Sequence, residues 1–152
     1  MEIEFKKVRE TQVAYIAHVG PYGEIGPLFA EIAGWLAGKG LQISAPPFGI
    51  YYDNPQAVPA EKLRCEVGFP FIGKTQREGK IKVKKIPARE VLSRIHKGPY
   101  GEVGPVYEAL TRYATEKGYS IVGAPIEIYL NAPGEVPESE LLTEVQIPVT
   151  KE

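Results

Sequence analysis

Apolar side chains recur at helical spacing in two segments of the chain. In each segment the apolar positions fall at i, i+4, i+7 and i+8, which places them on one face of a helix. They are Leu28, Ile32, Trp35 and Leu36 in the first segment and Val106, Leu110, Tyr113 and Ala114 in the second. Gly26 is a suitable N-cap, and Pro27 and Pro105 suit the first helical turn. Gly40 and Gly118 suit the position just after a helix. The pattern predicts helices over about residues 27–40 and 105–118.

Short runs rich in β-branched and aromatic residues flank both helices and predict strands. In the first half these runs cover residues 3–8, 13–19, 47–52 and 63–69. The second half repeats them, with a strand opening at Ile81 and later strands at residues 125–130 and 141–149. Each half therefore reads ββαββ, and the chain has about eight strands and two helices. Because the connections are short, we expect an α+β fold in which helices cover a curved antiparallel sheet.

The two halves are related by a constant offset, which takes Gly20 to Gly98. Residues 18–27 read HVGPYGEIGP, and residues 96–105 read HKGPYGEVGP. When residues 3–72 are aligned at this offset without a gap, 25 of 70 positions are identical. This self-similarity predicts an internal duplication with repeats at about 3–72 and 81–150, joined by a linker at 73–80. Two long copies are too few for a solenoid, so we expect a single domain over 1–152 with a pseudo-two-fold axis.

Composition narrows the class of protein. The 152 residues carry a formal charge of −1 with dispersed basic residues, which argues against direct nucleic-acid binding. Neither a signal peptide nor an apolar run long enough to span a membrane is visible, and the lone Cys65 has no disulfide partner. We therefore expect a cytoplasmic protein without membrane association.

No cofactor or metal is expected. The only histidines, His18 and His96, lack metal-binding spacing, and we expect structural roles for them. Residues 68–75 match the P-loop pattern GxxxxGK[ST], but the loop holds two Phe and a Pro and runs on into a strand instead of a helix. Cys65 has no local activating group and is expected to be a small buried residue.

Carboxylates on the last strand of each half are the best candidates for chemistry. Alternation puts Glu144 on the face opposite the aliphatic residues, and Glu66 is its counterpart in the first half. In the preceding strand, Glu127 and Tyr129 share one face, and Tyr51 matches Tyr129. In the simplest register each half presents a Glu and a Tyr together. Such a face could simply be solvated, could bind aromatic cations, or could supply a general acid or base.

The chain resembles the GyrI-like small-molecule-binding domain, the family of the gyrase-inhibitory protein and of the effector-binding domains of AraC-type and MerR-type multidrug regulators. The resemblance rests on the Gly-Pro-Tyr turn into each helix, the segment PPFGIYYDNP (46–55), the segment LLTEVQIPV (141–149) and the duplication. It implies a central cleft on the pseudo-two-fold axis that binds bulky hydrophobic, often cationic, compounds.

The resemblance also implies which residues line that cleft. It places the family's binding glutamate at Glu144 and, together with the pattern above, nominates as ligand-binding residues Glu144, Glu66, Tyr51, Tyr129, Trp35, Tyr113, Tyr22 and Tyr100. Stand-alone members of the family are also implicated in hydrolysing cyclopropanoid toxins, for which Glu144 and Tyr129 would be the catalytic pair here. A strand begins at about residue 3, so we expect a stand-alone module without a helix-turn-helix. Its partners would be a small hydrophobic or cationic ligand and, in the alternative, a protein such as gyrase or a separate regulator.

Overall fold

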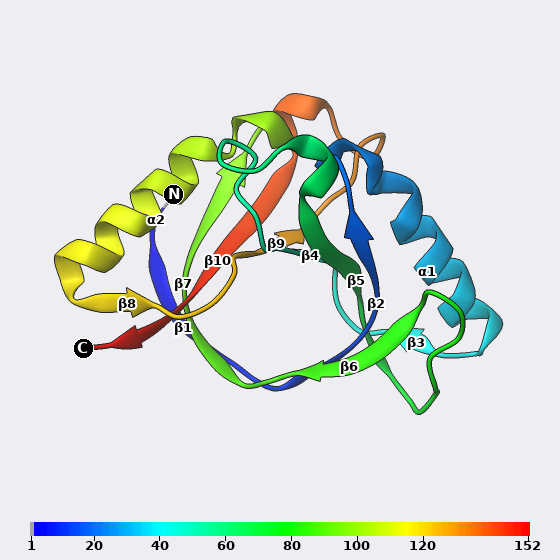
Figure 1. Cartoon of the computed structure of the whole chain (residues 1–152). Helices are drawn as coiled ribbons and strands as arrows, with labels where there is room; N and C mark the ends of the chain where they lie inside the picture. Colours follow the sequence, from blue (N-terminus) through cyan, green and yellow to red (C-terminus); the bar gives the residue numbers. More distant parts are fainter. Residues whose placement is uncertain (1) are drawn as a thin grey trace. The chain divides into compact units, whose positions relative to one another are not determined.

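The computed structural model describes residues 2–152, which divide into two compact units (Figure 1). Of the described residues, unit 1 contains 2–9 and 88–152, and unit 2 is the continuous segment Glu10–Pro87. Each unit is described by itself below.

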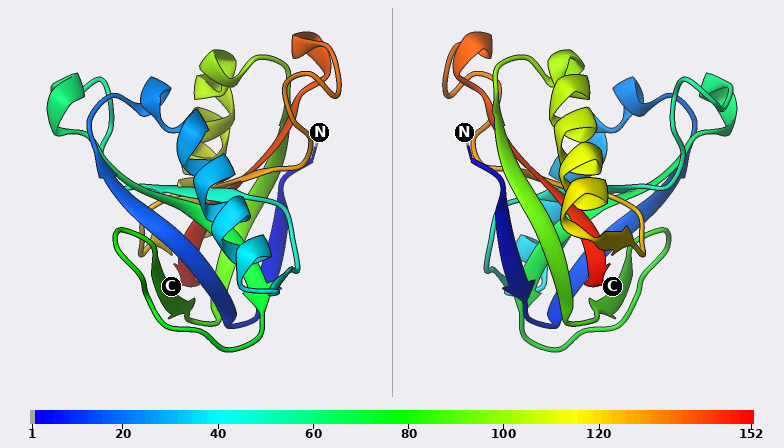
Figure 2. Two further views of the ribbon diagram at one scale, coloured as in Figure 1. Left: turned by 90° about the vertical axis from the view of Figure 1, so that its right-hand side faces the viewer. Right: turned by 90° about the vertical axis from the view of Figure 1, so that its left-hand side faces the viewer.

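Unit 2 is an antiparallel sheet with one helix on it. Its elements are β2 (Thr11–Val19), the 3-10 turn η1 (Tyr22–Glu24), α1 (Gly26–Gly38), β3 (Gln42–Ile43), β4 (Phe48–Tyr51), η2 (Ala60–Lys62), β5 (Arg64–Ile72) and β6 (Lys82–Ile86). The strands pair in the order β4-β5-β2-β6, and β3 adds to the far end of β5. The helix α1 packs across β5 and β2, as the left-hand view of Figure 2 shows.

Unit 1 has the same plan. Its elements are β1 (Glu4–Val8), β7 (Arg89–Lys97), η3 (Tyr100–Glu102), α2 (Gly104–Lys117), β8 (Tyr119–Ile121), β9 (Ile126–Tyr129), η4 (Glu138–Glu140) and β10 (Leu142–Lys151). The strands pair in the order β1-β7-β10-β9, all antiparallel, and β8 adds to the end of β10. The helix α2 lies across β7 and β10 in the right-hand view of Figure 2.

The predicted α+β class, with two helices and antiparallel strands, is confirmed. Two strands beyond the predicted eight, β3 and β8, are only two and three residues long and carry no alternation that a sequence reading could detect. The helix ends are close to prediction: Gly40 and Gly118 adopt φ of 71° and 77°, the left-handed region that suits glycine after a helix. The predicted N-cap is wrong by one residue, because Gly26 already belongs to α1 and Ile25 precedes it.

The first strand of each predicted repeat pairs outside its own repeat. β1 does not form a hairpin with β2 but pairs with β7, and β6 pairs with β2 instead of β7. The links between these consecutive strands are Arg9-Glu10 and Pro87-Ala88, which lack the Asn-Gly or Asp-Gly chemistry of a two-residue hairpin turn.

Helices and strands of the two units begin at residues related by the same offset that aligns the two halves of the sequence. Apart from the exchanged strands β1 and β6 and the short strands β3 and β8, each element of unit 1 begins at the position that corresponds to the first residue of its counterpart in unit 2. Thus β2 begins at Thr11 and β7 at Arg89, and α1 begins at Gly26 and α2 at Gly104. Residues aligned between the repeats therefore occupy comparable places in the two units.

Each helix buries its predicted stripe against one face of its sheet. In unit 2 the fully buried Ile32 and Leu36 contact a core that includes Val67, and in unit 1 Leu110 contacts a core that includes Val145. Fully burying a side chain of this size contributes about 1.5–3 kcal/mol. The helix therefore defines a covered face of each sheet, called here the helix face; the other side is called the open face.

Candidate ligand-binding site

The strand register separates the residues that the sequence analysis had grouped. In unit 1 Tyr129 lies opposite Thr143, while Glu144 lies opposite Ile128. Directly opposed residues share a face, and successive residues alternate, so Tyr129 is on the helix face and Glu144 is on the open face. The expectation that Glu144 and Tyr129 share one face is therefore wrong: the simplest register is off by one residue, which reverses every side chain of a strand. The structure does not bring the predicted catalytic pair together.

Unit 2 shows the same separation. Glu66 lies opposite Ile50, and Tyr51 lies opposite Cys65 in the core of the helix face. The predicted grouping of Glu66 with Tyr51 is wrong for the same reason. Cys65 is buried as predicted, and burial raises the pKa of its thiol to about 11, which makes it a poor nucleophile at neutral pH.

Glu144 on the open face is surrounded by donors. One of its oxygens, Oε2, accepts hydrogen bonds from Ser93 Oγ at 2.7 Å, from Gln146 Nε2 at 2.9 Å and from Lys6 Nζ at 2.9 Å. Glu144 is only 9% exposed. Burial alone would raise the pKa of its carboxyl, but the bonds from Gln146, Ser93 and Lys6 outweigh burial and lower the pKa below its ordinary value. Glu144 is thus an ionised, compensated carboxylate and not a base poised near neutral pH.

Glu66 has a related environment. Its Oε1 forms an ion pair with Lys84 and accepts a hydrogen bond from Tyr52 Oη at 2.9 Å. Lys84 corresponds to Lys6, and Glu144 corresponds to Glu66, at the offset between the repeats, so the two lysine–glutamate pairs occupy matching positions. Both pairs join the sheet to the strand that comes from the other repeat.

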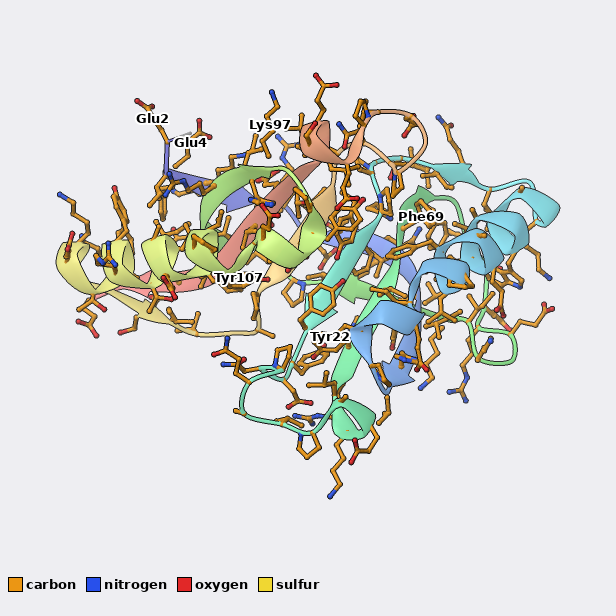
Figure 3. The ribbon with its side chains drawn as sticks, turned by 90° about the horizontal axis from the view of Figure 1, so that it is seen from above. Glu2, Glu4, Tyr22, Phe69, Lys97 and Tyr107 are labelled. Carbon is orange, nitrogen blue, oxygen red and sulfur yellow. The ribbon has the colours of Figure 1, made fainter. Side chains whose placement is uncertain are left out.

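A second carboxylate of unit 1, Glu127 on β9, lies among tyrosines on the helix face. Tyr107 Oη donates to Glu127 Oε2 at 2.5 Å, and Tyr129 Oη donates to Oε1 at 3.1 Å. Tyr107 comes from the first turn of α2 and is labelled in Figure 3. Tyr100, from η3, contacts the Tyr129 ring edge-on, with 5.4 Å between centroids and 66° between planes. We call Glu127, Tyr100, Tyr107 and Tyr129 the tyrosine–glutamate cluster.

The charge of Glu127 is poorly compensated. Burial raises the pKa of its carboxyl above the ordinary value, and the hydrogen bonds from Tyr107 and Tyr129 offset this only in part. His96 also favours the ionised form, through charge alone. Within residues 2–152, no lysine or arginine forms an ion pair with Glu127, unlike Glu144 and Glu66.

Unit 2 has the aromatic part of this cluster without the acid. Tyr22 and Tyr51, which correspond to Tyr100 and Tyr129, contact each other edge-on with centroids 4.9 Å apart. The counterpart of Glu127 is Gly49, where an added Cβ would lie 2.5 Å from Tyr51 Oη. Tyr51 therefore fills the space that a side chain at position 49 would need. The Tyr22 hydroxyl lies 2.9 Å from the carbonyl oxygens of Asp53 and Arg64, which fixes the following loops.

The predicted helix aromatics serve the cores of their units. Trp35 packs against the core of unit 2 and Tyr113 against the core of unit 1. Four residues later along the chain a lysine lies over each ring: Lys39 Nζ, just after α1, is 5.7 Å from the Trp35 centroid, and Lys117 Nζ, at the end of α2, is 5.9 Å from that of Tyr113. The structure brings neither residue into contact with a carboxylate of the candidate site.

An open recess of about 460 Å³ adjoins the tyrosine–glutamate cluster. Tyr100 lines it on one side, and residues of the loop that follows β9 line the other, among them Pro133, Val136 and Leu141. Tyr100 is the member of the cluster that lines the recess, and its ring also contacts Tyr129. The recess thus combines aromatic and aliphatic side chains with one carboxylate, that of Glu138.

The sequence analysis placed Glu127 beside Tyr129 but did not choose it as a site residue. The predicted glutamates, Glu66 and Glu144, lie on the last strand of each half, and the resemblance places the binding glutamate at Glu144, whereas Glu127 has no acidic counterpart in the first half. One feature of the sequence points to Glu127. The equivalent residue in the first half is Gly49, and Glu127 is the acidic residue of an apolar strand, where Ile126 and Ile128 flank it.

Other site types receive no support from residues 2–152. No group of three or more His, Cys, Asp and Glu side chains in this part of the chain is placed to hold a metal ion. Across the same residues, no helix has the length and apolar character needed to cross a membrane.

Comparison with solved structures identifies close matches of the fold. The crystal structure of the EcmrR C-terminal domain matches with a TM-score of 0.88 and 26% identity, and the match covers 99% of this chain and 98% of that domain. EcmrR in complex with DNA matches equally well, but the chain spans only 58% of that protein. SAV2435 bound to tetraphenylphosphonium shares the fold, with a TM-score of 0.61 and 12% identity over 99% of this chain and 94% of the other.

Relatives are also found by sequence. The DNA gyrase inhibitor of Salmonella arizonae is 29% identical over 138 residues, which is 86% of this chain and 88% of the relative. The testis-expressed protein 264 homolog of Mus musculus is 43% identical, but only over 61 residues, so the match covers 40% of this chain and 18% of the mouse protein.

A family model describes nearly the entire chain. The model of the GyrI-like small molecule binding domain matches residues 1–150, in agreement with the gyrase inhibitor and with the EcmrR C-terminal domain. The chain belongs to the GyrI-like family of small-molecule-binding domains.

Proposed function

We propose that this protein binds a bulky aromatic cation, with Glu127 as the counter-charge and the tyrosines of unit 1 as the contact surface. The observation that carries the proposal is the environment of Glu127. Its side chain is half-buried and accepts hydrogen bonds from the hydroxyls of Tyr107 and Tyr129, and desolvation raises the pKa of its carboxyl. A bound cation would supply the positive charge that the ionised carboxylate lacks.

The same reasoning argues against Glu144 and Glu66, the two predicted glutamates, as the group that binds the cation. Glu144 and Glu66 already pair with Lys6 and Lys84, so a cationic ligand would have to displace a lysine that belongs to the sheet. We therefore assign the anchoring role to Glu127 instead of Glu144. Tyr129 and Tyr100 keep their predicted place as ligand-contacting residues, and Tyr107 joins them.

The aromatic surroundings support a flat or bulky hydrophobic cation over a small one. Tyrosine rings offer cation–π attraction of about 0.5–1 kcal/mol at exposed sites and more where water is excluded. The recess beside Tyr100, about 460 Å³, is within the size range of small-molecule pockets. The family description, a small-molecule-binding domain, fits this use. SAV2435, which shares the fold, has been solved with the aromatic cation tetraphenylphosphonium.

Binding of a fluorescent cation tests the proposal. A rhodamine ester titrated into wild-type protein should show saturable anisotropy, while fluorescein, an anionic dye of similar shape, should bind much more weakly. Glu127→Gln removes the charge and keeps an acceptor, and it should weaken the rhodamine by about 1–3 kcal/mol, the contribution of a charged hydrogen bond. Glu144→Gln is the matched control on the other face and should change the affinity little. Equal losses in the two variants would contradict the assignment.

The pH dependence supplies an independent readout. The proposed cation binds only protein molecules in which Glu127 is ionised. Protein molecules in which Glu127 is protonated must therefore release that proton when they bind the cation. Because the pKa of Glu127 is raised by burial, the affinity of wild-type protein should fall as the pH is lowered from neutral towards that pKa. Glu127→Gln should show a flatter profile over the same range.

A second candidate function, inhibition of DNA gyrase, follows from the match to the Salmonella arizonae DNA gyrase inhibitor over 88% of its length. This role would use an exposed surface of the protein. A supercoiling assay with purified gyrase should then show dose-dependent inhibition that Glu127→Gln leaves unchanged. Full supercoiling activity at a large molar excess of this protein would rule the role out.

A further inference from the structure

The outer edge of β7 is only partly covered. β1 pairs with β7 from Arg89 to Ser93 and stops there, because Glu4 is its first residue and Ile3 packs against the core of unit 1 instead. β7 itself continues to Lys97. The last four residues of the strand, Arg94–Lys97, therefore have β10 on one side and no described strand on the other.

The backbone direction along this edge follows from one hydrogen bond. Gly98 N donates to Leu141 O, so residue 98 faces β10, and alternate residues before it do the same. Ile95 and Lys97 consequently point their N–H and C=O groups away from β10. An unpaired edge of this kind is a template for the addition of another strand.

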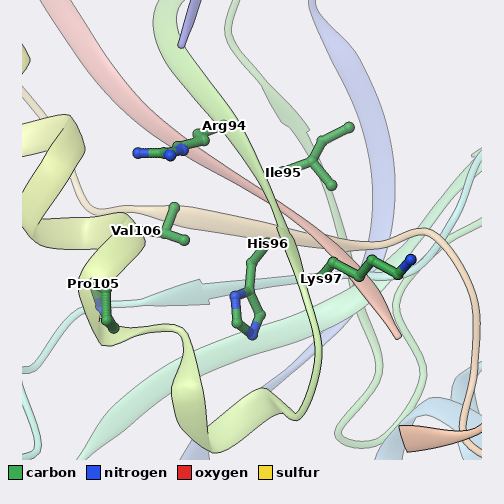
Figure 4. A pocket seen from close by; sticks show the side chains of 6 residues that line it. All are labelled: Arg94, Ile95, His96, Lys97, Pro105 and Val106. Atoms are coloured by element: carbon green, nitrogen blue, oxygen red, sulfur yellow. The ribbon is translucent and has the colours of Figure 1, made fainter. Parts of the chain in front are cut away.

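Two basic side chains flank the edge, one on each face. Arg94 lies opposite Val145 on the helix face, and Lys97, three residues later, lies on the open face opposite Leu142. Within residues 2–152 neither side chain forms an ion pair. Together with Ile95, His96, Pro105 and Val106, they line an open recess of about 240 Å³, shown in Figure 4.

We propose that the Arg94–Lys97 edge is an interaction surface that takes an extended acidic peptide by strand addition. The peptide backbone bonds to Ile95 and Lys97, and its acidic side chains pair with Arg94 and Lys97. Because the two cations lie on opposite faces and are three residues apart, the partner needs acidic residues at i and i+3, which also alternate between faces. The proposed contacts do not include Glu127, although Arg94 and Glu127 both lie opposite Val145 on the helix face, and the proposal does not depend on the proposed ligand.

The chain contains its own control for this proposal. In unit 2, β6 covers β2 only as far as Tyr15, and the hydrogen bond from Gly20 N to Leu63 O shows that Ala17 and Val19 point outward. This edge corresponds to Arg94–Lys97 in the alignment of the two repeats, but its residues are Ile16, Ala17, His18 and Val19. It offers the same backbone groups without arginine or lysine.

The test uses capped six-residue peptides of threonine and valine with two glutamates. One peptide carries the glutamates three positions apart, and a control of identical composition carries them two positions apart, on one face of a strand. Titration of the whole protein, followed by the backbone amide NMR signals, should show the first peptide shifting Ile95 and Lys97 and binding about tenfold more tightly than the control. Binding should weaken as salt is raised.

Three variants locate the interaction. Ile95→Pro removes an outward N–H without removing a bond to β10 and should weaken the peptide about tenfold. The paired variant Arg94→Gln with Lys97→Gln should weaken it by at least as much and should abolish the preference for glutamates three apart. Ala17→Pro, the matched change on the neutral edge, should have no effect. Thermal unfolding confirms that each variant is folded.

Several outcomes would overturn the proposal. Unchanged binding to Ile95→Pro would show that the peptide does not add as a strand. Equal affinity for the two peptides, or competition by free glutamate at similar concentration, would show a small-anion site instead. NMR signal shifts at Ala17 and Val19 in place of Ile95 and Lys97 would show that the peptide binds the edge of β2 in unit 2 and not the edge of β7.

Discussion

Lys6 pairs with Glu144 at 2.9 Å although the two residues are 138 positions apart. The contact exists because β1 leaves the repeat in which it begins and joins β7, the neighbour of β10. Lys84 and Glu66 form the corresponding pair in unit 2, from β6 and β5. Each unit therefore uses a lysine of the incoming strand to neutralise a glutamate of the sheet.

Replacing Lys6 with methionine should destabilise the protein by about 1–3 kcal/mol, because the buried Glu144 loses its cation while keeping its charge. Lys84→Met should cost less, since Glu66 is more exposed, with 18% of its side chain accessible against 11% for Glu144. Urea unfolding at neutral pH measures both. A cost in Lys84→Met equal to or larger than that in Lys6→Met would contradict this ranking of the two pairs.

The loss of folding stability at acidic pH should depend on Glu144. Burial favours its protonated form, but the bonds from Gln146, Ser93 and Lys6 outweigh burial, so the folded-state pKa is lowered. A carboxyl with a lowered pKa contributes stability above its unfolded-state pKa, about 4.3, and that stability is lost as the pH falls through the folded-state pKa. Glu144→Gln should thus be less stable at neutral pH and should show a shallower loss between neutral and acidic pH. Parallel curves for wild type and variant would argue against this.

Glu127 should act in the opposite direction. Burial raises its folded-state pKa, so folding favours the protonated form: the contribution to stability is present below the unfolded-state pKa and is lost as the pH rises through the folded-state value. Glu127→Gln, which cannot ionise, should therefore be more stable than wild type at neutral pH, and the difference should shrink towards acidic pH. Melting temperatures from calorimetry between neutral and mildly acidic pH measure the effect. If Glu127→Gln were less stable than wild type at neutral pH, the claim that the charge of Glu127 is poorly compensated would be wrong.

Two glycines of unit 2 should differ in their tolerance of alanine. A Cβ at Gly68 would lie 2.0 Å from the Ala14 carbonyl oxygen, a backbone atom of the neighbouring strand, whereas a Cβ at Gly49 would meet only the Tyr51 side chain. Gly68→Ala should cost about 3 kcal/mol or more and Gly49→Ala about 1–2 kcal/mol, both measured by urea unfolding.

A double-mutant cycle separates the two cases. Tyr51→Leu should reduce the cost of Gly49→Ala, because it removes the ring that the new Cβ meets, and should leave the cost of Gly68→Ala unchanged. Additive costs at Gly49 and Tyr51 would show that the ring is not the obstacle.

The local structure is readable from sequence because single segments determine it. The apolar stripes and the flanking proline and glycine residues predict both helices, and alternation correctly separates Glu144 from the aliphatic residues of its strand. The strand pairing cannot be predicted in this way. A two-residue link allows two consecutive strands either to form a hairpin or to pair with strands of different units, as β1 and β2 do. The link composition, Arg9-Glu10, decides between them only weakly.

The candidate site depends on register, which the sequence leaves undetermined by one residue. Tyr129 shares its face with Glu127 in any register, because the two are alternate residues of one strand, but the observed pairing of Tyr129 with Thr143 separates it from Glu144. The predicted duplication also favours residues that both repeats retain, such as Glu66 and Glu144. Glu127, where the repeats differ, is the only carboxylate of the three that has no lysine partner among the described residues. The cleft expected on the pseudo-two-fold axis stays a prediction.

The exchange of β1 and β6 has a consequence for folding during synthesis. Unit 2 is continuous from Glu10 to Pro87, so all its strands are available once the chain up to Pro87 has left the ribosome. Unit 1 combines β1 with strands from β7 onwards, and its central strand β10 is made after all of them. Until then β1 has no complete sheet to join. The two units therefore differ in the order in which their strands are made, and the unit that holds Glu127 must wait for β10.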